Sequence, residues 1–404
     1  MKIRLYIIIG FAIVTFFSSD MFLPSIPQIA QYFHVSESTA QLSIILFFVG
    51  QLSLTLFWGT LADKLGHQKV FNIGVYVFLY GTVLCTLSTS ISSFFIGRII
   101  EGLGSGVAPV VGLAIIQSMY PNDKSTRIMS LVGGVIALAP MIAPSIGGQI
   151  ERIWGWRGNF YCILFMVILI VICFGKLPKE KKNIQQKKIN KNVFQIYVQI
   201  ISNKIFTSWI YIFAFLACGQ WCFITIIPFF YKNELALTAP TIGALMTFSS
   251  MFFITGTFSV NKILRYISVN TLIRLGTKIS ILGGIGLLLL HLFNCYSPAL
   301  ISLSFGIYLL GASLLWGSTS SKALQCFKES LGSASAVRSL FLISFFALGS
   351  YLGTFISSKN LLFIAVLLIM CSITSAFIHY RIEKITILND IEEASSNLDA
   401  DACS

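Results

Sequence analysis

The sequence predicts an all-α membrane protein in which twelve transmembrane helices form two pseudo-symmetric six-helix halves. Of the 404 residues, 56% are hydrophobic and 11% are charged, and the mean hydropathy is +0.84. A soluble domain has about 25% charged residues. The apolar residues form runs near the roughly 20 residues that a helix needs to cross a bilayer. A lysine-rich break follows the sixth run, which indicates two halves of a repeated fold.

Short polar segments separate the apolar runs, and each run is expected to form one membrane-spanning helix. The first run follows Lys2 and Arg4 and has no small-residue cleavage site, so it is expected to be an uncleaved span rather than a signal peptide. The twelve predicted spans are 5–28, 39–61, 70–89, 91–117, 128–150, 156–175, 206–230, 240–260, 272–293, 298–321, 331–356 and 361–380.

The chain is expected to have four parts. Residues 1–175 form the N-terminal six-helix half, and residues 206–380 form the C-terminal six-helix half. Between them, residues 176–205 carry eight lysines against the single acid Glu180, which is typical of a solvated basic linker. Residues 381–404 form an acidic tail, for which we expect no regular structure.

The positions of the basic residues predict the orientation of the helices. Alternate polar segments, beginning with the N-terminus, hold 21 of the 28 lysines and arginines. Basic residues accumulate on the cytoplasmic side of membrane proteins, so both termini are expected in the cytoplasm. This distribution accounts for the net charge of +13, and no nucleic-acid partner is expected.

The residue types that carry most enzyme chemistry form no recognisable pattern. The nine cysteines include no CxxC pair, and the four histidines are far apart in the sequence. No HExxH motif, aspartate pair or Ser/His set is present. We therefore expect no metal site, no cofactor and no enzymatic activity.

Three charged residues within the spans are candidates for function. Asp20 and Glu101 are the only ones of the 15 acidic residues inside spans, and Arg98 precedes Glu101 by three positions, which places both on one helix face. A charge at the bilayer centre costs about 2.5–3.5 kcal/mol on insertion scales and usually marks a function. At 1.5 Å per residue, Asp20 lies about 22 Å from the cytoplasmic edge and Arg98 about 10 Å from the outer edge. In a core about 30 Å thick these depths are similar, so a shared cavity is one interpretation, and a purely structural Arg–Glu pair is the other.

Two further cations fall within spans. Lys278 lies one turn after Arg274 and is expected to reach the cytoplasmic surface through its long side chain. Arg338 lies about 10 Å into span eleven. It is expected either to reach the surface in the same way or to line the cavity.

The segment GTLADKLGHQKV, residues 59–70, resembles the signature loop of the major facilitator superfamily. His67 and Gln68 stand where that family usually has basic residues. The resemblance implies that the aspartate of the motif lies near the start of span eleven and stabilises one conformation, since a helix N-terminus attracts negative charge. The residues of this expected conformational latch are Gly59, Asp63, Lys64 and Gly66.

The segment LAPMIAPSIGG, residues 138–148, resembles the antiporter motif of drug:proton exchangers. Proline removes a backbone hydrogen bond and bends a helix, and a plain kinked packing helix is the alternative. The segments DMFLPSIP (20–27), WGWRGNF (154–160) and GSASAV (332–337) resemble the Bcr/CflA subfamily of multidrug exporters. The residues of the expected antiporter motif are Pro140, Pro144, Gly147 and Gly148.

The Bcr/CflA resemblance implies a proton-coupled antiporter that exports amphipathic small molecules or drugs across the bacterial inner membrane. It implies that the proton gradient drives transport, that Asp20 titrates, and that Arg98 is the arginine of span four; Glu101 departs from the family, which usually has glutamine there. The expected partners are a small-molecule substrate, protons and the lipid bilayer, and we expect a monomer. The residues that could line its cavity are Phe17, Phe48, Trp221, Trp316 and Arg338.

Two questions remain open from the sequence. An exporter of an endogenous metabolite, such as a siderophore or a polyamine, would carry the same motifs, whereas the antiporter motif argues against a proton-coupled uptake symporter. Glu101 could favour cationic substrates, or it could only neutralise Arg98 and leave substrate choice to the aromatic side chains.

Overall fold

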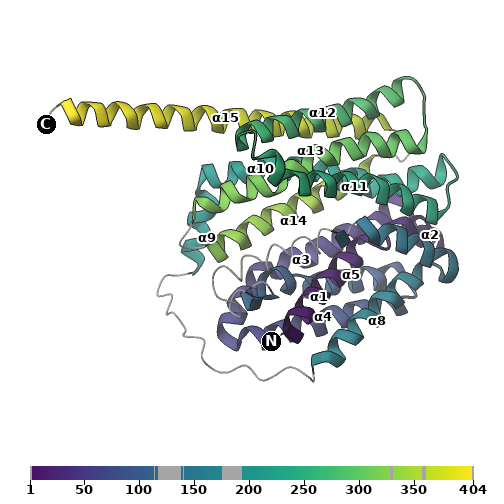
Figure 1. Cartoon of the computed structure of the whole chain (residues 1–404). Coiled ribbons are helices and arrows are strands. Elements are labelled where there is room, and N and C mark those ends of the chain that lie inside the picture. The colour runs from purple at the N-terminus through teal and green to yellow at the C-terminus, as the bar shows by residue number, and fades with distance from the viewer. Residues whose placement is uncertain are drawn as a thin grey trace.

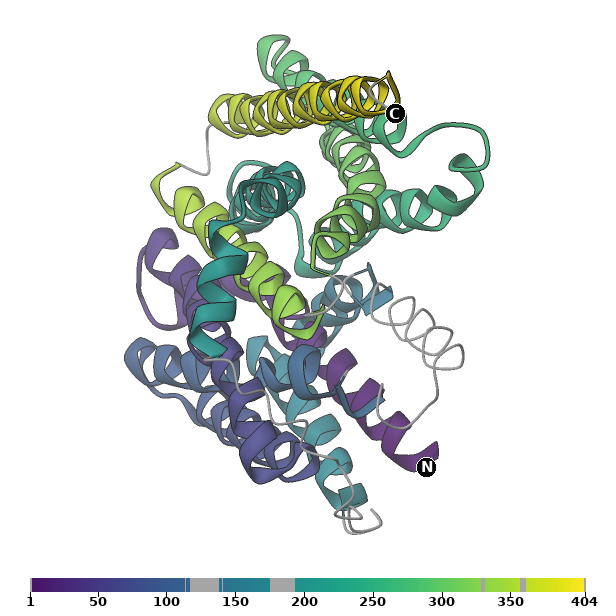
Figure 2. The same ribbon diagram turned by 90° about the vertical axis from the view of Figure 1, so that its left-hand side faces the viewer.

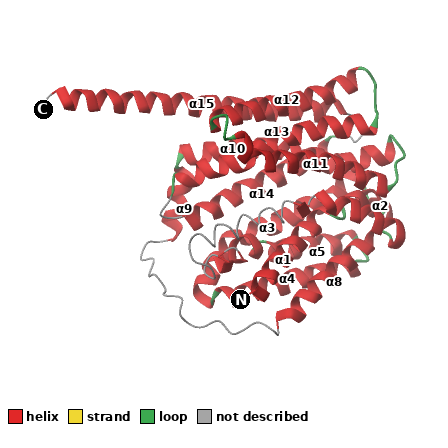
Figure 3. Cartoon of the chain, viewed as in Figure 1, coloured by secondary structure: helices red, strands yellow, loops and turns green. Residues whose placement is uncertain are grey.

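The computed structural model describes residues 2–112, 114–116, 138–139, 141–174, 193–327, 331–356 and 361–402. Within these ranges the chain is helical apart from short turns, and they contain no strand (Figure 3). Eleven helices in this part of the chain are long and apolar enough to cross a membrane. The expected span 128–150 is described only from residue 138, so the twelfth span stays a prediction. The all-helical membrane fold is confirmed.

The helices form two groups, one above the other in Figure 1. Figure 2 shows the same two groups from one end of the bundle. The N-terminal group consists of α1 (Lys2–Asp20), η1 (Leu23–Ser25), α2 (Ile26–Tyr32), α3 (Glu37–Leu65), α4 (His67–Leu87), α5 (Ile91–Ser105), η2 (Ala108–Gly112), a helix over 141–154 and α8 (Trp156–Phe174). The C-terminal group consists of α10 (Lys204–Asn233), α11 (Ala239–Ile263), α12 (Val269–Leu292), α13 (Pro298–Gln325), α14 (Leu331–Phe355) and α15 (Leu361–Ala402), with α9 (Val193–Ser202) leading into it.

Side chains of the turns fix where several helices begin. Ser36 caps α3 by accepting a hydrogen bond from the backbone N–H of Thr39 at 3.2 Å. Ser90 and Ser93 form a reciprocal capping box at the start of α5. Such caps satisfy backbone N–H groups that have no partner within the helix.

The segment that resembles the superfamily signature is less of a loop than expected. Helix α3 continues to Leu65 and α4 begins at His67, so Gly66 alone makes the turn. Gly66 has φ 93° and ψ 139°, which a residue with a side chain rarely adopts. The helix that contains span two therefore continues four residues past the expected end of that span at residue 61.

Three other boundaries differ from the sequence-based expectation. The first span reaches Tyr32, with a 3₁₀ segment over Leu23–Ser25 where Pro24 and Pro27 interrupt the regular bonding. The solvated linker expected over 176–205 does not extend across α9, because Val193–Ser202 is helical and Ile200 is fully buried. The tail also differs, since α15 runs as one helix to Ala402 and projects beyond the bundle (Figure 1).

The bundle has two ends, which we name by the short helices that lie there (Figure 1). The α2 end holds α2, the start of α3 and the start of α11; the α9 end holds α9, the start of α10 and the start of α14. At the α2 end, hydrogen bonds join the two groups. The Nδ2 of Asn233 donates to Oε1 of Glu37 at 2.6 Å, and the Nε2 of Gln41 donates to the carbonyl of Thr225 at 3.1 Å.

Candidate functional site

Arg98 and Glu101 form a fully buried ion pair on α5. The Nη1 of Arg98 lies 2.6 Å from Oε2 of Glu101, and both side chains are at most 1% exposed. The spacing of three residues placed them on one helix face, as the sequence predicted. Removing two charges from water is costly unless their remaining hydrogen-bonding groups are also satisfied.

The neighbouring helices satisfy those groups. The Nε of Arg98 donates to the carbonyl of Ser43 on α3 at 3.2 Å, and Nη1 donates to the carbonyl of Ser18 on α1 at 3.2 Å. The guanidinium carbon lies 4.4 Å from the ring centroid of Phe22 and 4.5 Å from that of Phe47, which are cation–π distances. Arg98 thus connects α1, α3 and α5 through one side chain.

Glu101 contacts α4 as well as Arg98. Its Oε1 accepts a hydrogen bond from Oγ1 of Thr82 on α4 at 2.9 Å, and the side chain is fully buried. Gly81 of α4 lies so close to Glu101 that an added Cβ would overlap the Glu101 backbone. This tight α4–α5 contact supports the interpretation of Glu101 as the structural partner of Arg98.

Asp20 is the other acid that the sequence singled out. It is the last residue of α1, is 5% exposed, and accepts a hydrogen bond at Oδ2 from Oγ of Ser19 at 3.1 Å. Ser18, which Arg98 contacts, is two residues away, yet in the described part of the chain no ion pair joins Asp20 to Arg98. The structure therefore brings Arg98 and Glu101 together and leaves Asp20 as a buried carboxyl nearby.

The expected antiporter motif forms a tight seam with α11, which we call the glycine seam and define by Pro144, Gly148, Ala239 and Gly243. A Cβ at Gly148 would overlap the carbonyl oxygen of Ala239, and a Cβ at Gly243 would overlap the carbonyl oxygen of Pro144. Hydroxyl groups reinforce this contact across the two groups of helices. Ser145 is 2.7 Å from Thr247, and Thr247 donates to the carbonyl of Met141 at 2.6 Å.

The remaining glycine of the motif faces the end of α1. A Cβ at Gly147 would overlap the carbonyl oxygen of Met21, the residue after Asp20. The helix over 141–154 therefore touches the Asp20 turn on one side and α11 on the other. Pro140, the first residue of the expected motif, lies outside the described residues.

Two segments that resemble the Bcr/CflA subfamily contact each other at the α2 end. The Nδ2 of Asn159 donates to Oγ of Ser25 at 2.8 Å, and the backbone N–H of Trp156 donates to Oε1 of Gln28 at 2.6 Å. Gly155 supplies a turn with φ 70° between the two helices. The Asn159–Ser25 hydrogen bond pairs one buried polar side chain from each segment, and Gln28 lies one residue past the first segment.

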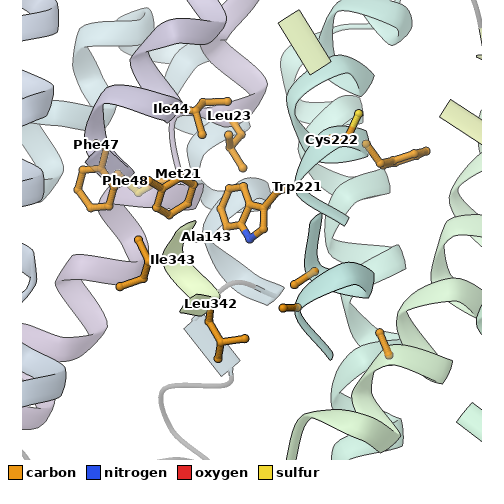
Figure 4. Packing of buried hydrophobic residues seen from close by; sticks show 14 of the residues in the cluster. Met21, Leu23, Ile44, Phe47, Phe48, Ala143, Trp221, Cys222, Leu342 and Ile343 are labelled. Carbon is orange, nitrogen blue, oxygen red and sulfur yellow. The ribbon is translucent and has the colours of Figure 1, made fainter. Parts of the chain in front are cut away.

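The residues expected to line a cavity fall into two places. Phe48 and Trp221 meet edge to face, with ring centroids 4.6 Å apart, and Phe346 lies 5.8 Å from Phe48. Figure 4 shows Phe48 and Trp221 facing each other between the two groups of helices. Phe48 and Trp221 are 3% and 8% exposed, so they form a packed contact in this conformation, and Phe17 packs at the edge of the same core.

Trp316 and Arg338 form the second place, on α13 and α14. The guanidinium carbon of Arg338 lies 5.4 Å from the Trp316 ring centroid, and Nε donates to Oγ of Ser320 at 2.9 Å. Arg338 is partly exposed. It belongs to the C-terminal group alone and has no part in the Arg98 pair.

Of the expected conformational latch, the structure describes Gly59, Lys64 and Gly66 but not the side chain of Asp63. Lys64 is exposed, and a Cβ at Gly59 would meet Val110 at 3.6 Å, an ordinary contact rather than a close helix approach. Asp63 lies in α3, but its side chain is outside the described residues. At the start of α14, a Cβ at Gly332 would have nothing within 4 Å. The role of the latch remains a prediction.

Several contacts that join the two groups carried no signal in the sequence. Gln41, Ser145 and Thr247 are polar residues in largely apolar helices, and none belongs to a motif that predicts a contact with a distant helix. Their partners lie about a hundred or more positions away, so only the packing of the helices identifies them.

The family model of the Major Facilitator Superfamily matches residues 8–344. The chain is 24% identical over 372 residues to the multidrug resistance protein MdtL of Klebsiella pneumoniae, covering 92% of this chain and 93% of that protein. It is 25% identical over 349 residues to a bicyclomycin resistance protein homolog of Haemophilus influenzae, covering 85% and 86% of the two chains.

Solved structures show the same fold. The chain matches a partially occluded inward-open conformation of the xylose transporter XylE from E. coli with a TM-score of 0.71 at 14% identity, covering 92% of this chain and 96% of that one. It matches a D-xylose-proton symporter with a TM-score of 0.74 at 13% identity, covering 93% and 97%. The chain belongs to the Major Facilitator Superfamily, and it is a membrane transporter rather than an enzyme.

Proposed function

We propose that this transporter exports amphipathic small molecules, including drugs, in exchange for protons across the bacterial inner membrane, with both termini in the cytoplasm. The observation that carries the proposal is Asp20, a buried carboxyl whose described partner is the neutral hydroxyl of Ser19. An ionised carboxylate taken out of water without a cation costs free energy. The protonation of Asp20 therefore depends on any conformational change that alters the access of its carboxyl group to water.

The names of the curated relatives support export. One is called a multidrug resistance protein and another a bicyclomycin resistance protein homolog. The matched solved structures support the fold alone, since their sequence identity to this chain is 13–14%.

The proposed orientation gives the glycine seam a role. The basic residues favour cytoplasmic termini, so the α2 end faces outward and the seam closes the outer side of the bundle in this conformation. The Asp20 turn touches the same helix through Met21 and Gly147. Opening the seam would hydrate Asp20, and closing it would bury the acid again.

The coupling then rests on competition between two ligands. A ligand shifts an equilibrium between conformations only through its different affinity for the two states. Protonation of Asp20 from the outside favours closure of the seam, because a neutral acid is buried more easily than a carboxylate. Substrate entering from the cytoplasm favours release of that proton.

Everted inner-membrane vesicles test the function. Respiration acidifies their interior, and ethidium or a neutral drug is then added outside. We expect substrate accumulation that a protonophore abolishes, together with proton release when substrate is added, and neither effect in vesicles without the protein. Accumulation that persists with the gradient collapsed would contradict proton coupling. A metabolite screen in the same vesicles separates drug export from export of an endogenous compound.

A further inference from the structure

Arg338 is a cation within a membrane-spanning helix that has no acidic partner among the described residues. Its Nε donates to Ser320, while its Nη1 and Nη2 atoms have no hydrogen bond within the described chain. The described ion pairs involve Arg98 and Arg274 instead. Arg338 is partly exposed and lies seven residues after the first residue of α14, which corresponds to about 10 Å of helix.

Two other arginines, Arg98 and Arg157, use the terminal nitrogens of the guanidinium for hydrogen bonds. Arg98 has Glu101, Ser18 and Ser43 as partners. Arg157 donates to the carbonyl of Ser88 and to the hydroxyl of Tyr32. Arg338 differs from these two because neither its Nη1 nor its Nη2 donates a hydrogen bond to a described residue.

Three aromatic side chains, Trp316, Phe213 and Phe253, lie beside the Arg338 guanidinium or against one another. The guanidinium carbon is 5.4 Å from the ring centroid of Trp316. Phe213 of α10 meets Trp316 at 4.9 Å and Phe253 of α11 meets it at 6.4 Å, both edge to face. The indole is thus fixed by two neighbouring helices while it remains partly exposed.

The chemistry of these groups indicates one class of ligand. A guanidinium presents parallel N–H groups that match the two oxygens of a carboxylate, and this bidentate pair is stronger than a neutral hydrogen bond. The hydrogen bond to Ser320 orients the plane of the fork. An indole face accepts an aromatic ring in a stacked or edge-to-face arrangement.

We propose that Arg338, Ser320 and Trp316 form a subsite for the carboxylate of an amphipathic aromatic substrate. The inference rests on the proposed transport of amphipathic molecules and names one class of them. It does not involve Asp20, so binding at this subsite can be measured separately from proton coupling.

Equilibrium dialysis of the purified full-length protein in detergent tests the subsite with two probes, 2-naphthoate and 2-naphthamide. They share the ring and nearly the same shape, and only the first carries a charge. We expect naphthoate to bind at least tenfold more tightly. Arg338→Gln should weaken naphthoate at least tenfold and leave naphthamide within twofold, and Arg338→Lys should fall between the two, because lysine keeps the charge without the planar fork.

Two further variants complete the design. Lys278→Gln removes an exposed cation from a span of the same group and should leave both probes unchanged. Ser320→Ala should weaken naphthoate severalfold, and it keeps the proposal testable if Arg338→Gln does not fold. Equal binding of both probes, or equal loss of both in Arg338→Gln, would overturn the subsite. Proton exchange in vesicles is a separate readout, so failure of the subsite is distinguishable from failure of the exporter.

Discussion

Gly148 lies against the backbone of Ala239, and no side chain larger than hydrogen fits between them. A Cβ at Gly148 would overlap the Ala239 carbonyl oxygen. The two residues belong to different groups of helices, so this contact measures whether the α2 end is closed. Small residues permit such close helix approach in membranes.

Gly148→Val should therefore open the α2 end. The reporter is a cysteine in place of Met21, which is fully buried beneath the seam. We expect a membrane-impermeant maleimide to label this cysteine severalfold faster in the Gly148→Val protein than in the protein that keeps Gly148. Labelling of the chain without that cysteine gives the background that is subtracted from both rates. Gly10→Val is the matched control, since a Cβ there meets Ile170 at an ordinary 3.9 Å. Equal labelling rates in both valine variants would show that the seam does not gate access.

Breaking the buried ion pair should destabilise the N-terminal group. Removal of one partner leaves an uncompensated buried charge, which costs about 3–5 kcal/mol. Glu101→Gln should lower the thermal unfolding temperature in detergent and reduce export of lipophilic cations and neutral drugs alike. The double variant Arg98→Met/Glu101→Met should recover part of the lost stability. A selective loss of cation export in a stably folded Glu101→Gln protein would instead make Glu101 a recognition residue.

The turn between α3 and α4 offers a test of backbone strain. At Gly66, φ is 93° and ψ is 139°, and a residue with a Cβ in such a region costs about 1–3 kcal/mol. Gly66→Ala should lower the unfolding temperature by several degrees. Gly332→Ala should change it little, because nothing lies within 4 Å of the added atom. Equal shifts in the two variants would contradict the assignment of strain to Gly66.

The buried carboxyl group of Glu151, at the α2 end, should make the stability of the protein depend on pH. It stands just past the expected fifth span, and burial raises its pKa from 4.5 to about 7, while a hydrogen bond with Ser25 and the charge of Lys232 act in the opposite direction. The folded state then holds this proton more tightly than the unfolded chain. Its contribution is fully present below pH 4.5 and is lost as the pH rises through about 7.

The wild-type unfolding temperature should therefore fall between pH 5 and pH 8, and Glu151→Gln should reduce that fall. Thermal unfolding of the purified protein at the two pH values measures it. Glu234→Gln removes an exposed acid at the same end of the bundle and is the control. If the two variants show the same pH response, Glu151 is not the group responsible.

The sequence predicted those features that depend on local spacing or on membrane physics. The three-residue spacing of Arg98 and Glu101 was sufficient to predict their shared face. The length of the apolar runs was sufficient to predict the eleven spans that the described residues contain. The direction of that face was not predictable, because a helix with apolar residues on all sides gives no orientation. Packing of Gly81 against Glu101 turned the acid toward α4.

The sequence did not predict where α3 ends, because charged residues suggested an earlier end than the one in the structure. Helix α3 continues through Asp63 and Lys64 although both are charged, and it ends only at Gly66, whose positive φ makes the turn. Contacts such as Gln41 with Thr225 and Arg338 with Trp316 join residues from different helices. Their pairing depends on how the helices pack, which no local pattern in the sequence records.

The central claim is that Asp20 carries the proton. It predicts that Asp20→Asn keeps wild-type expression and unfolding temperature, because amide and neutral acid have nearly the same shape, while it abolishes proton release on addition of substrate to acidified everted vesicles. Glu234→Gln, which removes an exposed acid, should retain proton release. Substrate-induced proton release at the wild-type rate from the Asp20→Asn protein would contradict the account.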